Sequence, residues 1–146
     1  MDTEAVAAAG TAPLRTDLAL LEAATTQAEL TGALGALQRT GAGGVVGFYV
    51  DNDAKEPTRY AVHLVQGGLG LPDEAYYRDA QYAPVLAAYR PHVARMLRLG
   101  GAAADETQAD ELAGRVLALE TKLAAGHWDV VKIGRASCRE RVCLVV

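Results

Sequence analysis

The side chains best suited to metal chemistry in this sequence are its three histidines, His63, His92 and His127. Neutral imidazole is a common zinc ligand, and catalytic zinc sites use about three protein ligands plus water. No two of these histidines form an H-E-x-x-H pair, in which ligands four residues apart share one face of a helix. Glu120 and His127, seven residues apart, can share a helical face. That spacing alone is a weak signal for a metal site, and the alternative is a surface or helix-end histidine that binds no metal. The sequence therefore assigns no catalytic, cofactor-binding or metal-binding residue.

Two neighbouring tyrosines are the next candidates for a site. Tyr76 and Tyr77 follow the acids Asp73 and Glu74, and these four side chains could line a polar pocket. Such tyrosines more often bury their rings and leave their hydroxyls in water. No Ser-His-Asp set can be assembled, because Ser137 lies in a C-terminal segment of foreign character.

Two glycine-rich stretches, residues 41–44 and 66–73, raise the question of phosphate binding. A nucleotide-binding loop needs a strand, then G-x-G-x-x-G, then a helix. The second stretch lacks the third glycine, and the first precedes a predicted strand rather than a helix. We interpret both as loops that need a positive φ angle or a close approach of backbones.

The composition favours packed helices. The sequence is 51% hydrophobic but only 5% aromatic, and its net charge of −4 does not suggest a nucleic-acid partner. No uncharged apolar run approaches the roughly 20 residues of a membrane helix, and the acidic start Met-Asp-Thr-Glu lacks the features of a secretory signal. As written, the chain is expected to stay in the cytosol, although an upstream segment would change that.

Residues 132–146 differ from the rest of the sequence. They hold both cysteines, Cys138 and Cys143, and carry a net charge of +3, which leaves −7 for the first 131 residues. The string from Ile133 to Val142 resembles a translated sequencing adapter, and scars of this kind are excluded from fold reasoning. We therefore interpret residues 132–146 as a non-native tail with two free thiols, and we expect the tail from Ile133 not to pack on the rest of the chain. A basic functional tail is the alternative.

Apolar periodicity predicts four helices in residues 1–131. Pro13 suits a helix start, and Thr26 with Glu29 forms a capping-box pattern. Glycines 41–44 and 100–101 are expected to end helices, and Pro91 is expected to kink one. The predicted core stripes are Leu14, Leu18 and Leu21; Leu30, Leu34 and Leu37; Tyr82, Leu86, Tyr89, Val93, Met96 and Leu97; and Ala109, Leu112, Val116, Leu119 and Leu123.

Two strands are predicted between the second and third helices. Residues 45–50 are rich in β-branched side chains, residues 60–65 alternate, and a polar segment with a proline separates them. A lone hairpin is marginal in water, so this one must pack on the helices. The predicted fold class is mainly α with a small β-hairpin.

Three motifs occur in a fixed order along the chain. Residues 48–60 contain Phe-Tyr-Val-Asp-Asn-Asp-Ala-Lys and then Arg-Tyr; residues 68–77 read Gly-Leu-Gly-Leu-Pro-Asp-x-x-Tyr-Tyr; and residues 119–124 precede a His-Trp pair. Together they resemble the neprilysin-like zinc metallopeptidases, of the neprilysin and endothelin-converting enzyme type. The family positions that the resemblance marks, which are structural rather than catalytic, are Gly68, Gly70, Leu71, Pro72, Asp73, Tyr76, Tyr77, Glu120, His127 and Trp128. Pro91 departs from the family pattern.

The resemblance implies a larger protein in which two mostly helical domains enclose a cavity with zinc at its wall. Residues 1–131 then belong to the N-terminal gating domain, which restricts the access of peptides, and Met1 is an internal codon. The zinc ligands, the general-base glutamate and the substrate-binding strand belong to the C-terminal half, so none is carried over to this chain. The intact protein would be periplasmic, extracellular or membrane-anchored.

The sequence thus predicts an incomplete segment of a zinc metalloendopeptidase or oligopeptidase that hydrolyses peptides. The segment shapes the substrate cavity, binds no zinc itself, needs the C-terminal catalytic domain of the same polypeptide as its partner, and is not catalytic alone. The alternative is a free-standing helical protein-interaction module. A reading frame that continues upstream of Met1 favours the first interpretation, and a start site and natural stop of its own favour the second.

Overall fold

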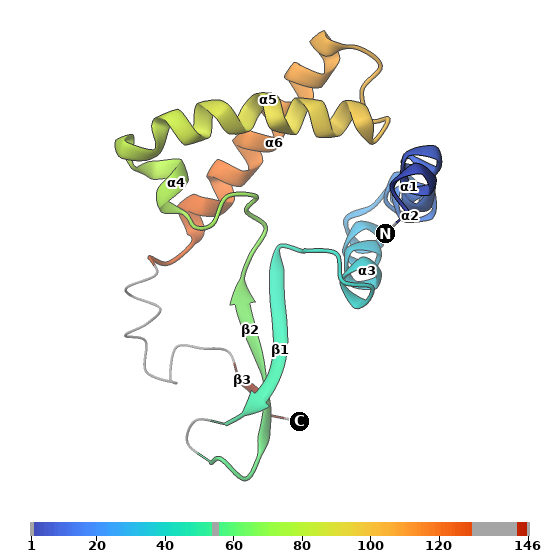
Figure 1. Cartoon of the computed structure of the whole chain (residues 1–146). Coiled ribbons are helices and arrows are strands. Elements are labelled where there is room, and N and C mark those ends of the chain that lie inside the picture. The colour runs from blue at the N-terminus through green and yellow to red at the C-terminus, as the bar shows by residue number, and fades with distance from the viewer. Residues whose placement is uncertain (1, 54–55, 130–142, 146) are drawn as a thin grey trace. The chain divides into compact units, whose positions relative to one another are not determined.

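The computed structural model describes residues 2–53, 56–129 and 143–145. Within them the chain is mainly helical with an antiparallel hairpin, as the sequence predicts (Figure 1). Its contacts divide it into a first unit, Met1–Ala42 with Arg90–Gly114, and a second unit, Gly43–Tyr89 with Arg115–Val146. The elements are α1 Thr3–Ala9, η1 Ala12–Leu14, α2 Arg15–Glu22, α3 Gln27–Arg39, β1 Val46–Asn52, β2 Tyr60–Gln66, α4 Ala75–Arg78, η2 Ala80–Tyr82, α5 Ala83–Leu99, α6 Glu106–Gly126 and β3 Cys143–Val145.

The predicted capping box begins α3. Thr26 Oγ1 accepts a hydrogen bond from the Glu29 N–H at 3.2 Å, and Glu29 Oε2 accepts one from the Thr26 N–H at 2.9 Å. The N–H and hydroxyl of Thr25 donate to the same carboxylate oxygen. These donors stabilise the charged form of Glu29 and hold its pKa below its usual range. The bond from the Thr25 N–H contributes most, and those from the Thr25 hydroxyl and from Thr26 add to it.

The prolines and glycines punctuate the helices mostly as expected. Pro13 lies in η1, directly before α2. Gly41 and Gly101, which follow α3 and α5, have φ angles of +99° and +79°, which glycine adopts without steric cost. Pro91 lies inside α5, which continues beyond it to Leu99, so this proline does not end the helix. The kink expected there stays a prediction.

The apolar stripe predicted for α6 is buried only in part. Leu119, which we assigned to the core, is 59% exposed, so that assignment is wrong. The best-buried residues of α6 are Ala109, Ala113, Glu120 and Ala124. Their spacing places them on one face of the helix, but alanines contribute little to an apolar periodicity. This face therefore buries small side chains and one carboxylate.

The other stripes also leave large side chains in solvent. Leu37 and Val93 are buried, whereas Leu14, Leu30 and Met96 are exposed, contrary to their assignment to the core. In the part of the chain that the structure describes, no large side chain is fully buried. Fully burying one such side chain contributes about 1.5–3 kcal/mol. Because these side chains stay at least partly exposed, the described residues gain only part of the burial energy that the hydrophobic composition allows.

The hairpin is confirmed, and its register separates two different faces. β1 and β2 pair antiparallel, with Phe48 opposite Leu64 and Val50 opposite Val62. Because side chains alternate along a strand, one face, called here the open face, carries Phe48, Val50, Tyr60, Val62 and Leu64, with Val46 and Gln66 at one end and Asn52 at the other.

The opposite face of the hairpin is better covered. It carries Tyr49, Ala61, His63 and Val65, which agrees with the predicted grouping of His63 with Ala61 and Val65. Ala61 and His63 are buried, and the His63 ring stacks on that of its cross-strand partner Tyr49 at a centroid distance of 4.9 Å.

The short strand β3 pairs antiparallel with residues 61–63 of β2. Our expectation that the tail does not pack on the rest of the chain is therefore wrong for residues 143–145. The adapter-like string from Ile133 to Val142 lies outside the described residues, and its foreign origin stays a prediction.

Candidate functional site

The carboxylate of Glu120 joins several elements of the second unit. Its Oε1 accepts hydrogen bonds from the Gly70 N–H at 3.1 Å and from the Tyr89 hydroxyl at 3.2 Å, and its Oε2 accepts one from the Tyr77 hydroxyl at 2.8 Å. The Tyr77 oxygen in turn accepts from the Leu71 N–H at 3.2 Å. We call these five residues the Glu120 cluster. It connects the loop between β2 and α4 with α4, α5 and α6.

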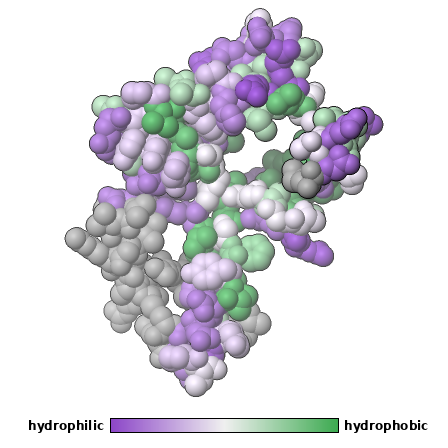
Figure 2. Space-filling view, viewed as in Figure 1, coloured by the Kyte–Doolittle hydropathy of each residue, from purple (hydrophilic) through white to green (hydrophobic). Residues whose placement is uncertain are grey.

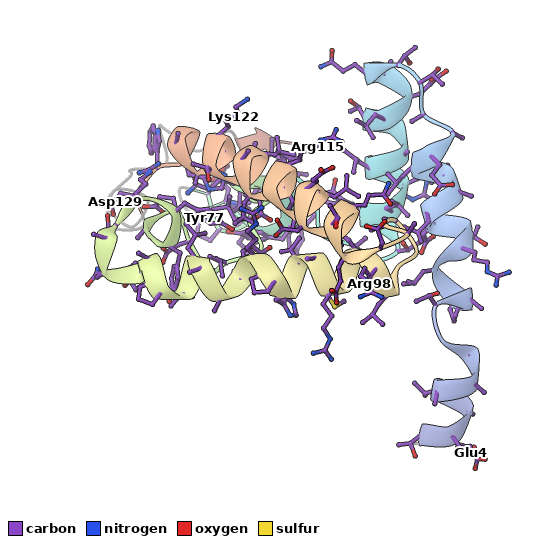
Figure 3. All side chains as sticks on the ribbon, turned by 90° about the horizontal axis from the view of Figure 1, so that it is seen from above. Glu4, Tyr77, Arg98, Arg115, Lys122 and Asp129 are labelled. Carbon is purple, nitrogen blue, oxygen red and sulfur yellow. The ribbon has the colours of Figure 1, made fainter. Side chains whose placement is uncertain are left out.

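The local structure around α4 sets the position of Tyr77. Asp73 Oδ1 accepts a hydrogen bond from the Ala75 N–H at 2.9 Å, a local turn contact at the first residue of α4. The single turn of α4 then carries Tyr77 to α6, and Figure 3 shows Tyr77 on the side of α6 that faces α5, whereas Lys122 extends from another side. Glu120 and Lys122, two residues apart on a helix, thus point in different directions.

The cluster satisfies a carboxylate that has little access to water. Glu120 is 9% exposed, and burying a carboxylate is costly unless donors surround it. Here three donors share its two oxygens, and hydrogen bonds to a charged acceptor are the stronger kind. A carboxylate so engaged is suited to fixing the loop and the helices rather than to taking a proton from a substrate.

The same surroundings perturb the two phenols. Burial, and after it the charge of Glu120, raises the pKa of Tyr89 to about 12. Burial also raises the pKa of Tyr77 far above its ordinary value, and the neighbouring Glu120 adds to this rise while the Leu71 N–H opposes it. Both hydroxyls therefore remain protonated at neutral pH and are available as donors.

Two glycines of the stretch 66–73 permit this packing. A Cβ on Gly70 would clash with the Tyr89 hydroxyl and lie 3.1 Å from Glu120 Oε1. Gly68 has a φ angle of +84°, and a Cβ there would lie 3.1 Å from Val45 Cα and 3.2 Å from Leu123 Cδ1. The interpretation of this stretch as a loop of positive φ and close approach is confirmed.

Two further contacts hold the end of α6. The Arg78 guanidinium donates to the carbonyls of Ala124 and His127, the second at 2.9 Å, and so satisfies oxygens that a helix end leaves without intrahelical partners. Gln66 Nε2 donates to the Trp128 carbonyl at 2.8 Å, while Gln66 Oε1 accepts from the Trp128 N–H at 3.0 Å. We call this reciprocal pair the Gln66–Trp128 clasp.

The structure brings some of the predicted motif residues together and leaves others apart. Gly70, Leu71, Tyr77 and Glu120 meet in the Glu120 cluster, and His127 and Trp128 contribute backbone atoms at the end of α6. Of the remaining motif positions, Asp73 accepts the Ala75 N–H at the start of α4, Gly68 packs near Leu123, Pro72 is exposed, and the Tyr76 ring stacks on Tyr82 at 4.2 Å.

The histidines do not meet as a ligand set. His63 lies on β2, His92 within α5, and His127 directly after α6. Both ring nitrogens of His63 lack a hydrogen-bond partner among the described residues. Within residues 2–53, 56–129 and 143–145, no group of three His, Cys, Asp or Glu side chains could hold a metal ion. The side chains present there do not fit a zinc site.

No helix in the described ranges has the length and apolarity to cross a membrane.

Sequence reasoning missed three residues of this site. The apolar stripe that contains Tyr89 predicts only core packing for it, although a partly buried tyrosine usually finds a partner for its hydroxyl. Arg78 and Gln66 were not singled out. Their signals were weak: Arg78 adjoins the tyrosine pair, and Gln66 is a polar residue at the end of an apolar strand, but their partners lie 46 to 62 residues away in sequence.

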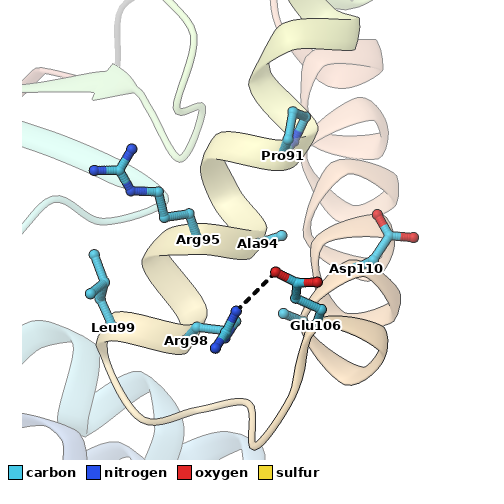
Figure 4. A pocket seen from close by; sticks show the side chains of 8 residues that line it. Pro91, Ala94, Arg95, Arg98, Leu99, Glu106 and Asp110 are labelled. Carbon is cyan, nitrogen blue, oxygen red and sulfur yellow. Dashed lines mark hydrogen bonds and ion pairs between the residues drawn. The ribbon is translucent and has the colours of Figure 1, made fainter.

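A pocket lies in the first unit. It has a volume of about 580 Å³ and is lined by residues of α5 from Pro91 to Leu99 and of α6 from Glu106 to Asp110 (Figure 4). Both of its acids are already paired: Glu106 with Arg98 at 3.1 Å, and Asp110 with Arg90 at 2.6 Å. Its lining contains no histidine and no nucleophilic side chain, so it offers less chemistry than the Glu120 cluster.

The chain is similar to known proteins over most of its length. The profile of the N-terminal domain of peptidase family M13 matches residues 1–138. Endothelin-converting enzyme-like 1 of Mus musculus is 38% identical over 100 residues, which are 65% of this chain and 12% of that protein. The Rattus norvegicus protein of the same name is 40% identical over 77 residues, 51% of this chain and 9% of its own length.

Solved structures agree with the sequence comparison. The crystal structure of Mycobacterium tuberculosis zinc metalloprotease Zmp1 with an inhibitor is 54% identical, with a TM-score of 0.84, over 90% of this chain and 20% of that one. The partial open state of the same protein gives a TM-score of 0.66 at 51% identity. This chain therefore spans about one fifth or less of the length of the proteins it matches.

Proposed function

Because the chain belongs to peptidase family M13 and matches a stretch of that family's N-terminal domain, we propose that it is a segment of the gating domain of a zinc metalloendopeptidase or oligopeptidase. In such a protein the segment forms part of the wall of the substrate cavity and contributes no catalytic group. The similarity to Zmp1, 54% identical with a TM-score of 0.84 over 90% of the chain, carries the proposal.

The chain's own residues support a positioning role. In the second unit, Glu120 gathers the N–H of Gly70 and the hydroxyls of Tyr77 and Tyr89, so that a glycine-rich loop becomes a fixed surface. The described residues offer no set of three metal ligands, so zinc and the hydrolytic step would belong to the rest of the parent polypeptide.

The test compares this chain with the uninterrupted polypeptide encoded at its genomic locus. We expect the parent polypeptide to contain zinc and to cleave quenched fluorescent peptides in a chelator-sensitive manner, and this chain to do neither. Peptides of increasing length, assayed on the parent, measure size selection. A parent polypeptide that is purified folded, takes up no zinc and cleaves no peptide would refute the proposal and favour the interaction module.

A further inference from the structure

The open face of the hairpin is an apolar surface without charge. Of its apolar side chains, Phe48 is 55%, Val50 65% and Tyr60 70% exposed. They lie on neighbouring strands in direct register, so their exposed areas are contiguous rather than scattered. Figure 2 shows hydrophobic residues beside hydrophilic ones on the visible side of the hairpin. A contiguous apolar patch on a soluble protein commonly marks an interaction site.

The open face holds no charged residue, and its polar side chains, Asn52 and Gln66, lie at its two ends. At the turn, Arg59 pairs with Glu56 at 3.0 Å. At the other end, the Gln66–Trp128 clasp holds Trp128, which is 46% exposed. The open face is thus bordered by an ion pair at one end and by an anchored aromatic residue at the other, which is the arrangement of an apolar centre with a polar rim.

The described residues of the second unit leave Phe48, Val50 and Tyr60 more than half exposed, while Val62 and Leu64 on the same face are half-buried. The unit's best-buried apolar residues among those described are Ala61 and Ala124, which are small, and Ala61 lies on the opposite face of the hairpin. The chain is similar in structure to a part of Zmp1, of which it covers only 20%. A parent polypeptide of that size would offer far more chain to pack on the hairpin.

We propose that the open face is an intramolecular docking surface, covered by an apolar segment from the part of the parent M13 polypeptide that lies outside this chain. This rests on the proposed function in one respect, namely that such a parent polypeptide exists. The occupant is neither solvent nor a second copy of the chain nor substrate, and each of these alternatives gives a distinct result below.

The first test is a matched pair of substitutions on the two faces of one hairpin. Val50→Thr on the open face and Val65→Thr on the other are isosteric and add one hydroxyl each, and both valines are exposed in this chain. A hydroxyl is tolerated in water but costly in an apolar contact. In the folded parent, Val50→Thr should lower the thermal midpoint by several degrees and Val65→Thr by clearly less. Equal, negligible shifts for both variants in the parent would overturn the proposal.

The second test is hydroxyl-radical footprinting of the unmodified proteins, read at Phe48 and Tyr60. Both residues should react severalfold more slowly in the parent than in this chain. Equal reactivity in the parent and in this chain would mean that the face stays exposed to solvent, which would overturn the proposal. Protection that appears in this chain with rising concentration would assign the face to a second copy, and protection in the parent only with a bound peptide would assign it to substrate. Peptidase activity of the same parent sample tests the proposed function separately, so either idea can fail alone.

Discussion

The Tyr77 hydroxyl donates a hydrogen bond to Glu120 Oε2 at 2.8 Å across 43 residues of sequence. The same oxygen of Tyr77 accepts the Leu71 N–H, so this one phenol links the loop to the buried carboxylate. Loss of the hydroxyl removes a donor from Glu120 and an acceptor from Leu71 at once.

We therefore expect Tyr77→Phe to destabilise the second unit by about 1.5–3 kcal/mol, the range for a hydrogen bond to a charged group. Tyr89→Phe should cost less, because its bond is longer, at 3.2 Å, and Glu120 Oε1 keeps the Gly70 N–H. Hydrogen exchange in the parent polypeptide measures the effect, with faster exchange of the Leu71 amide in Tyr77→Phe alone. Unchanged Leu71 exchange in that variant would contradict the geometry.

The raised pKa of Tyr89 predicts a loss of stability in alkali. A phenol that ionises at 10.0 when unfolded and at about 12 when folded stabilises the fold fully below pH 10.0. That contribution disappears as the pH rises from 10.0 to about 12, because the unfolded state releases its proton first. Tyr89→Phe should flatten this part of the stability profile, measured by urea unfolding at a series of pH values. A wild-type profile that rises over this interval would show that the sign is wrong.

Two glycine substitutions are expected to act in opposite directions. Gly70→Ala drives a methyl group into the Tyr89 hydroxyl and toward Glu120, and should destabilise the protein by more than about 1 kcal/mol. Gly32→Ala, within α3, meets nothing within 4 Å and should stabilise by about 0.5–1 kcal/mol, because alanine loses less backbone entropy in a helix. Thermal unfolding of the two variants measures both changes in stability. A Gly70→Ala protein as stable as the unmodified one would contradict the predicted clash with the Tyr89 hydroxyl.

Deleting residues 133–146 should lower the free energy of unfolding by no more than about 0.5–1.5 kcal/mol, the net contribution of one typical hydrogen bond, because β3 pairs with β2 over only three residues. Among the described residues of this segment, β3 is the part that pairs with the sheet, at its edge beside β2. Calorimetry of the truncated and complete chains is the measurement. A loss above roughly 2 kcal/mol would make the tail a structural element.

This chain alone should neither bind zinc tightly nor cleave peptides. A tight site needs about three ligands in preset geometry, which the described residues do not provide. Zinc titration by calorimetry, with a quenched peptide assayed in parallel, tests this. Stoichiometric, submicromolar binding would reveal a missed site, and Glu120→Ala and His127→Ala would be the first variants to make.

Local signals predicted the fold better than the site. The capping box of Thr26 and Glu29, the hairpin and the family itself were predicted from short motifs, and each is confirmed. The exposure of Leu119 was not predicted, because periodicity shows which face is apolar but not whether anything covers it. Likewise, nothing in the sequence around Tyr89 indicates that its hydroxyl meets a carboxylate 31 residues away.

The Gln66–Trp128 clasp has a consequence for the order of folding. It closes a loop of 62 residues, and closing a flexible loop of that length costs about 4 kcal/mol in chain entropy. Its two hydrogen bonds return only about 0.5–1.5 kcal/mol each, so they cannot close the loop by themselves. The clasp must therefore form after the helices between its partners have already shortened the loop, and it should be among the first contacts to open. Amide exchange at Trp128 would then report a partial opening of the native protein that precedes global unfolding.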